Sequence, residues 1–122
     1  MIEQMTSVLV IDDDAVFRAL AVRMLTESGL TVVGEADSVR AGRAAAAELQ
    51  PDAVLVDVML PDGDGVALAH ELAELPWEPR VLITSGSPEA VQGVQIAGDG
   101  VVGFVPKEEL PGAPLASLLG NA

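Results

Sequence analysis

Five short apolar segments, each followed by a longer stretch with helical periodicity, constrain the fold of this chain most strongly. The segments are residues 8–11, 31–34, 53–56, 81–83 and 101–105. Each is rich in β-branched residues and apolar at nearly every position, a pattern typical of strands that are buried on both faces. Strands that alternate with helices form a parallel sheet with helices on both sides. The sequence therefore predicts an α/β fold with a doubly wound, five-stranded parallel sheet.

Five helices are expected around this sheet, and most of them have recognisable ends. Ser38 is a suitable N-cap for the second helix, which must stop before Pro51. Asp64 is the candidate N-cap of the third helix, and Ser87 with the following proline begins the fourth. Gly29 lies where a C-terminal cap of the first helix belongs. The helical patterns cover residues 16–25, 38–49, 64–75, 87 onward and 114–119.

Length and composition limit what else the chain can be. Its 122 residues fit one compact domain, so we assign residues 1–122 to a single unit. Cysteine is absent, which rules out disulfides and thiolate metal sites. The net charge is −13, from 19 Asp and Glu against 6 Lys and Arg. Because such a surface repels phosphates, the chain is not expected to bind nucleic acid directly.

Neither a membrane span nor an export signal is predicted. No apolar run reaches the ~20 residues that cross a bilayer, and the first residues lack a basic region followed by an apolar one. A cytoplasmic location is therefore the default expectation. The Met1 start and the absence of a linker after Leu119 favour a free-standing domain.

Polar side chains follow several of the predicted strands. Asp12 and Asp13 come directly after the first strand, Asp57 after the third, Thr84 after the fourth and Lys107 shortly after the fifth. Ligands of open parallel sheets bind beyond the carboxyl ends of the strands, so these groups are expected to meet at one edge. Carboxylates bind Mg²⁺ and can attack phosphorus, while ammonium and hydroxyl groups contact phosphoryl oxygens. The pattern therefore predicts a phosphoryl-transfer site that uses Mg²⁺.

Four segments resemble the signatures of bacterial response-regulator receiver domains. They are Val-Leu-Val-Ile-Asp-Asp-Asp at 8–14, Asp-Val-Met-Leu-Pro-Asp-Gly-Asp-Gly at 57–65, Leu-Ile-Thr at 82–84 and Gly-Phe-Val-Pro-Lys at 103–107. These segments occur in the family's order and with similar spacings, and the resemblance extends over essentially the whole chain. It implies the flavodoxin-like fold, with strand order 2-1-3-4-5.

The resemblance also implies a role for each acid. Asp57 would be the phosphoacceptor, and Asp12 with Asp13 would be the acidic pair that binds Mg²⁺. Asp57 and the backbone carbonyl of Met59 would complete the protein ligands of the ion.

The remaining site residues would link phosphorylation to a change of surface. Lys107 would bind the phosphoryl group, Thr84 would be the switch hydroxyl, and Phe104 the switch aromatic. A sensor histidine kinase or a phosphotransfer protein would be the donor. The fourth helix, fifth strand and fifth helix would form the face that changes, and this face could carry a homodimer. Such a domain catalyses only its own phosphorylation and dephosphorylation, so it is a signalling switch rather than a metabolic enzyme.

Two alternatives remain open at this point. A phosphatase of the haloacid-dehalogenase type would use Asp12 as its nucleophile, with Asp14 two residues later. That reading leaves Asp57 and Pro61 unexplained, and no acidic pair follows a further strand after Lys107. A degenerate receiver would fold in the same way but act as a docking module without phosphorylation. Taken alone, the three successive acids could merely cap the first helix, but the positions of Asp57 and Lys107 argue against this reading.

Overall fold

The five-stranded parallel sheet that the sequence predicts is present. The structure, a computed structural model, describes residues 5–87, 89, 98 and 100–120. The strands of the sheet are β1 (Ser7–Ile11), β2 (Thr31–Ala36), β3 (Ala53–Asp57), β6 (Arg80–Ser85) and β7 (Val101–Pro106). Their order is β2-β1-β3-β6-β7, which is 2-1-3-4-5 when these five strands are counted along the chain. The predicted flavodoxin-like topology is therefore confirmed.

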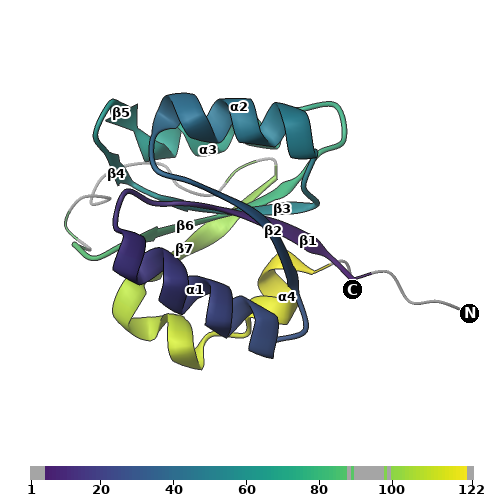
Figure 1. Ribbon diagram of the computed structural model, residues 1–122, viewed down its shortest axis with the longest axis vertical. Coiled ribbons are helices and arrows are strands. Elements are labelled where there is room, and N and C mark those ends of the chain that lie inside the picture. Colours follow the sequence, from purple (N-terminus) through teal and green to yellow (C-terminus); the bar gives the residue numbers. More distant parts are fainter. Residues whose placement is uncertain (1–4, 88, 90–97, 99, 121–122) are drawn as a thin grey trace, which may run out of the picture.

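Helices cover both faces of this sheet. They are α1 (Ala15–Glu27), α2 (Val39–Leu49), α3 (Gly65–Ala73), α4 (Leu115–Leu119) and the 3₁₀ helix η2 (Lys107–Gly112). Figure 1 shows α2 and α3 on one side of the sheet and α1 with α4 on the other. The fourth helix that the sequence predicts, from Ser87 onward, falls largely outside the described residues.

Most predicted helix ends agree with the structure. Asp14, Ser38 and Asp64 are N-caps, because their side chains accept hydrogen bonds from backbone N–H groups in the first turns of α1, α2 and α3. The prediction that the third helix continues through Leu75 is wrong, since α3 ends at Ala73. Leu75 precedes a proline, and the residue before a proline disfavours helical backbone angles, so the helix ends early.

The core has two halves, one on each face of the sheet, because successive side chains of a strand point to opposite faces. Leu9 and Ile11 pack with α2 and α3, whereas Val8 and Val10 pack with α1, η2 and α4. The Phe17 ring, in the first turn of α1, belongs to the second half. Together the two halves hold the carboxyl ends of the strands in fixed relative positions.

The sequence predicts that all five strands are buried on both faces. This is correct for the central strands and wrong for the outer ones. Every residue of β3 is buried, as is β1 after its first residue. In contrast, β2 alternates between exposed and partly buried positions, and Val33 is 39% exposed. The reason is that β2 lies at the edge of the sheet, with a neighbouring strand on one side only.

A small antiparallel hairpin, which was not predicted from the sequence, lies between β3 and α3. It pairs β4 (Met59–Leu60) with β5 (Gly63–Asp64). The Asp62 carboxylate at its tip accepts hydrogen bonds from the backbone N–H groups of Arg40 and Val39, at 3.0 and 2.7 Å. These bonds hold the pKa of Asp62 below its ordinary value. The hairpin is thus attached to the N-terminus of α2.

Among the described residues, no helix combines the length and the apolar character that crossing a membrane requires.

Candidate functional site

Three carboxylates meet at the carboxyl edge of the sheet. In the pairing of β1 with β3, Ile11 lies opposite Val56, so the residues that follow, Asp12 and Asp57, are neighbours. Ligand oxygens of Asp12, Asp13 and Asp57 all lie within 4.8 Å of one another. Asp12 is 1% exposed and Asp57 is 6% exposed, while Asp13 is open to solvent. The structure thus brings together the three acids that the sequence singled out.

Asp12 is held in place by several hydrogen bonds. Its backbone N–H donates to the Ala36 carbonyl at 2.9 Å, and its own carbonyl accepts from the Arg18 guanidinium at 2.6 Å. The Oδ1 atom of Asp12 accepts a hydrogen bond from the Asp14 backbone N–H at 2.8 Å. Arg18 in turn is paired with Glu35 at 3.0 Å. These bonds fix one oxygen of the carboxylate and leave Oδ2 for the cluster.

Lys107, the only lysine of the chain, lies against the acids. Its Nζ atom is 2.7 Å from Oδ2 of Asp12 and 3.7 Å from Oδ2 of Asp57. Oδ2 of Asp12 is buried and accepts no hydrogen bond of good geometry from the described residues, so the contact with Lys107 is an ion pair. The same ammonium lies 4.2 Å from the centroid of the Phe17 ring.

The pKa of Asp57 is raised from 3.8 to about 6. Burial is the main cause, because it disfavours the charged form, and the neighbouring charge of Asp12 is the second. The Lys107 ammonium and a hydrogen bond from the Met59 backbone N–H lower the pKa but do not cancel these effects. Without a cation, the cluster therefore carries electrostatic repulsion that a bound cation would relieve.

Thr84 lies opposite Asp57 in the sheet, whereas Phe104 lies one strand further away, on β7. Thr84 is also buried. Its hydroxyl donates a hydrogen bond to the Val105 carbonyl on β7, at 2.7 Å. The Phe104 ring is partly buried against the half of the core that lies on the α2–α3 side. A contact between the Thr84 hydroxyl and a group on Asp57 would require the bond to Val105 to break.

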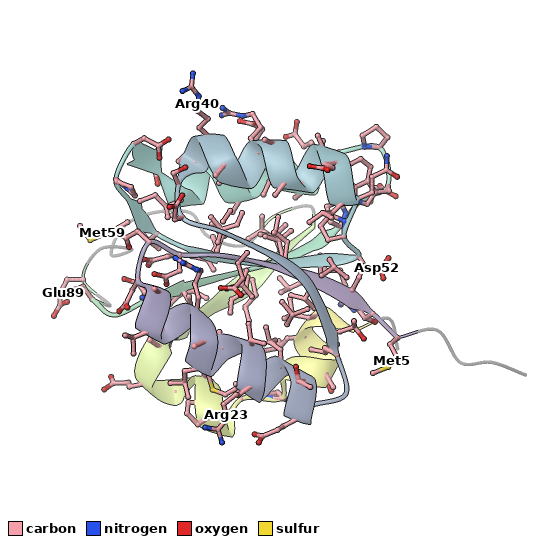
Figure 2. The ribbon with its side chains drawn as sticks, in the orientation of Figure 1. Met5, Arg23, Arg40, Asp52, Met59 and Glu89 are labelled. Atoms are coloured by element: carbon pink, nitrogen blue, oxygen red, sulfur yellow. The ribbon has the colours of Figure 1, made fainter. Side chains whose placement is uncertain are left out.

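The Met59 side chain points away from the protein. It is 62% exposed, and Figure 2 shows it at the end of the molecule opposite to Asp52, the residue that precedes β3. Its backbone N–H reaches the Asp57 carboxylate. The predicted role of its backbone carbonyl as a metal ligand stays a prediction.

Sequence reasoning missed three residues that shape the site. Phe17 contacts Lys107, and Arg18 holds the Asp12 backbone. Phe17 falls within the helical pattern of residues 16–25, which does not reveal its contact with Lys107. Gly65 lies so close to Asp57 that a β-carbon built on it would be 1.8 Å from the Asp57 carbonyl oxygen. Its place in the 57–65 segment was visible in the sequence, but the close approach was not.

The donor set fits a hard divalent cation. Mg²⁺ prefers oxygen ligands, and the cluster offers oxygens from three carboxylates within a small radius. One of these, Oδ2 of Asp12, is a buried oxygen without a hydrogen bond from the described residues. Asp12, Asp13 and Asp57 are therefore suited to hold Mg²⁺.

Comparison with known proteins shows relatives over nearly the whole chain. A family model for the response regulator receiver domain matches residues 8–116. BvgA of Bordetella pertussis, whose name describes a positive transcription regulator of virulence factors, is 38% identical over 103 residues. That alignment covers 84% of this chain and 49% of BvgA, so this chain spans about half the length of that relative.

Solved structures give the same result. The signal receiver domain of NarL from Mycobacterium tuberculosis is 32% identical, with a TM-score of 0.76, and the match covers 98% of this chain and 100% of that one. A response regulator from Burkholderia pseudomallei, described with a phosphorylated aspartic acid, a calcium ion and citrate, is 26% identical. Its TM-score is 0.74, and the match covers 95% of this chain and 68% of that one. The sheet order, the acid cluster and these matches agree, and the chain belongs to the response regulator receiver domains.

Proposed function

We propose that this domain accepts a phosphoryl group on Asp57 and that Mg²⁺ is held by Asp12, Asp13, Asp57 and the carbonyl of Met59. The observation that carries the proposal is the position of Asp57. Its nearly buried carboxylate lies close to both an acidic pair and the only lysine of the chain. The Burkholderia relative supports the assignment, since its structure is described with a phosphorylated aspartic acid and a divalent cation.

The side chains suggest how the transfer would proceed. An Asp57 oxygen attacks the phosphorus of the donor, and the bond between phosphorus and the leaving group breaks as the new bond forms. Asp12, Asp13 and Asp57 would hold Mg²⁺, which would supply positive charge against the phosphoryl oxygens. Lys107 lies 3.7 Å from Asp57, near enough to bind an oxygen of the incoming phosphoryl group. The Thr84 hydroxyl would leave the Val105 carbonyl and donate to another of these oxygens.

The donor is a sensor histidine kinase or a phosphotransfer protein. A donor must reach the edge of the sheet beside Asp13, where α1 begins. Two apolar side chains on α1, Val16 and Leu20, are 81% and 48% exposed there, and they provide a contact surface for a protein donor. The signal would then change the face formed by β7, α4 and the predicted helix after Ser87, through Thr84 and Phe104. The same face is our candidate for homodimer contacts.

Labelling with acetyl phosphate and Mg²⁺ tests the proposal. We expect wild type to gain the mass of one phosphoryl group, Asp57→Ala to gain none, and Asp14→Ala to remain labelled. Asp14 is the matched control because it belongs to the same acidic group but only caps α1. Peptide mapping locates the label. A label on Asp12 would indicate phosphatase-type chemistry, and a wild type that takes no label from acetyl phosphate or a kinase would indicate a degenerate receiver.

Mg²⁺ should stabilise the folded domain, and Asp13→Asn should weaken this effect. A ligand that binds only the native state stabilises it by ~2.7 kcal/mol at a hundredfold excess over its dissociation constant. Removing one charge from the cluster also relieves repulsion, so Asp13→Asn should be at least as stable as wild type without metal. Thermal melts with EDTA and with a series of Mg²⁺ concentrations measure both effects. Equal Mg²⁺ shifts for the two proteins would contradict the proposed ligand set.

A further inference from the structure

The Lys107 ammonium contacts the aromatic ring of Phe17, a residue that has no role in the proposed phosphoryl transfer. It lies 4.2 Å from the centroid of the Phe17 ring, within the range of a cation–π contact. Phe17 is 8% exposed, and the Lys107 side chain is 20% exposed, so water screens this contact only partly. The chain has one lysine and two phenylalanines, which makes the pair unusually accessible to measurement.

The first turn of α1 ties this ring to the acid cluster. The backbone N–H of Phe17 donates to the Asp14 side chain at 3.2 Å. Arg18, the next residue, donates to the Asp12 carbonyl at 2.6 Å. The ring and the carboxylates are therefore held by the same short segment. A lysine that contacts both is fixed relative to the phosphoacceptor.

The ring holds Lys107 in a way that the acids alone cannot. A lysine side chain is long and flexible, and ordering it costs conformational entropy. A carboxylate that binds a cation is less able to keep the lysine, because the two positive charges compete for the same oxygen. Here the competed oxygen is Oδ2 of Asp12, 2.7 Å from the ammonium. An aromatic face attracts the ammonium through its quadrupole. Because the ring has no oxygen that could bind Mg²⁺, its contact with the ammonium persists when the cation binds.

We propose that Phe17 is a positioning residue, whose ring keeps the Lys107 ammonium beside Asp57 when the acids are engaged with a cation. The inference rests on the proposed phosphorylation of Asp57 and adds a residue to that site. A positioning role requires the aromatic ring of Phe17, whereas a purely structural role requires only an apolar side chain. Leucine would keep an apolar side chain in the core and lose only the aromatic face.

Nuclear magnetic resonance of protein labelled with ¹³C-lysine tests the contact directly. Because Lys107 is the only lysine, the spectrum has a single set of lysine signals. Protons above an aromatic face are shielded, so the terminal methylene signals should lie upfield of their usual position, with and without Mg²⁺. Phe17→Leu should return them to that position. Phe104→Leu, which removes the other phenylalanine, should leave them shifted.

Phosphorylation by acetyl phosphate tests the consequence. We expect Phe17→Leu to slow labelling of Asp57 by roughly threefold to tenfold, the size expected for losing a partly exposed cation–π contact. Phe17→Tyr keeps the ring and should restore the wild-type rate. In a Lys107→Met background, Phe17→Leu should cause no further loss, because the lysine that the ring positions is already gone.

Leu25→Val controls for stability, since Leu25 is buried in the same half of the core on the same helix. It should lower stability while leaving both the lysine signals and the rate unchanged. Unshifted lysine signals in the wild type, or an equal loss of rate from Phe17→Leu in the Lys107→Met background, would overturn the inference. An unlabelled wild type would overturn the proposed function instead, and the lysine signals would still decide whether the contact exists.

Discussion

Replacing Gly65 with alanine should destabilise the domain by about 2–4 kcal/mol and should also slow phosphorylation of Asp57. A β-carbon at this position would be 1.8 Å from the Asp57 carbonyl oxygen and 2.8 Å from the Val58 α-carbon. Both neighbours are backbone atoms, so no side chain can rotate to make room. The Gly65 backbone N–H also donates to the Val58 carbonyl at 2.7 Å, which keeps the two segments close.

Helix propensity opposes this effect but is too small to cancel it. Alanine is favoured over glycine by ~1 kcal/mol inside a helix, and Gly65 is the first residue of α3, where the gain is smaller. The steric conflict should therefore dominate. Because the backbone that must move carries Asp57, the acceptor carboxylate should shift relative to Lys107 and the labelling rate should fall.

Urea denaturation and acetyl phosphate labelling of the same variants measure both effects. Gly112→Ala is the matched control, because nothing lies within 4 Å of a β-carbon built there and its backbone angles suit alanine. Its midpoint and labelling rate should match wild type. If Gly65→Ala denatured at the same urea concentration as Gly112→Ala, the close packing of α3 against β3 would be refuted.

The sequence predicts the fold well because each strand and helix carries its own signal. Buried strands are apolar at consecutive positions, and Asp14, Ser38 and Asp64 are side chains that cap helices by themselves. The order of strands then follows from a family resemblance and the preference for right-handed crossovers. Exposure of Val33 was less predictable. It arises because β2 has a neighbouring strand on one side only, and the residues of β2 do not themselves reveal this position in the sheet.

The acid cluster was also predictable, whereas its supports were not. Residues at the carboxyl ends of parallel strands lie at the same edge of the sheet. The sequence alone was therefore enough to predict that Asp12 and Asp57 lie close together. Phe17 and Gly65 act through three-dimensional neighbours that are 90 and 8 positions away, namely Lys107 and Asp57. Helical periodicity explains an apolar residue at position 17, and the family signature at 57–65 includes a glycine at 65. Neither pattern shows that Phe17 contacts Lys107 or that Gly65 packs against Asp57.

Asp57→Asn should stabilise the metal-free domain at neutral pH by about 2–3 kcal/mol. The pKa of Asp57 is raised from 3.8 to about 6 in the folded protein, chiefly by burial and then by the Asp12 charge. The folded state therefore holds the Asp57 proton more tightly than the unfolded state does. Between the two pKa values the folded state binds more protons, so the stability of wild type falls as pH rises from about 4 to about 6.

Asparagine has nearly the shape of the protonated acid and cannot ionise. The stability difference between Asp57→Asn and wild type should therefore be small near pH 4, grow through pH 6 and stay constant above it. Other carboxylates titrate in the same experiment, including Asp62 and Glu71, whose pKa values are lowered by their hydrogen bonds. Asp62 and Glu71 are present in both proteins and do not contribute to the pKa shift of Asp57, so their contributions cancel in the difference. Urea denaturation in EDTA at several pH values gives the curve.

Adding Mg²⁺ should then reduce the stability advantage of the variant. The cation offsets the burial and the Asp12 charge that make ionised Asp57 unfavourable. It also binds wild type through one more carboxylate than Asp57→Asn offers. Wild type should gain stability with rising Mg²⁺ concentration, while Asp57→Asn should gain little, and the two curves should approach or cross above pH 6. Parallel pH curves in EDTA would mean that Asp57 titrates normally. The repulsion that we assign to the empty cluster would then be absent, and relief of that repulsion could not contribute to Mg²⁺ binding.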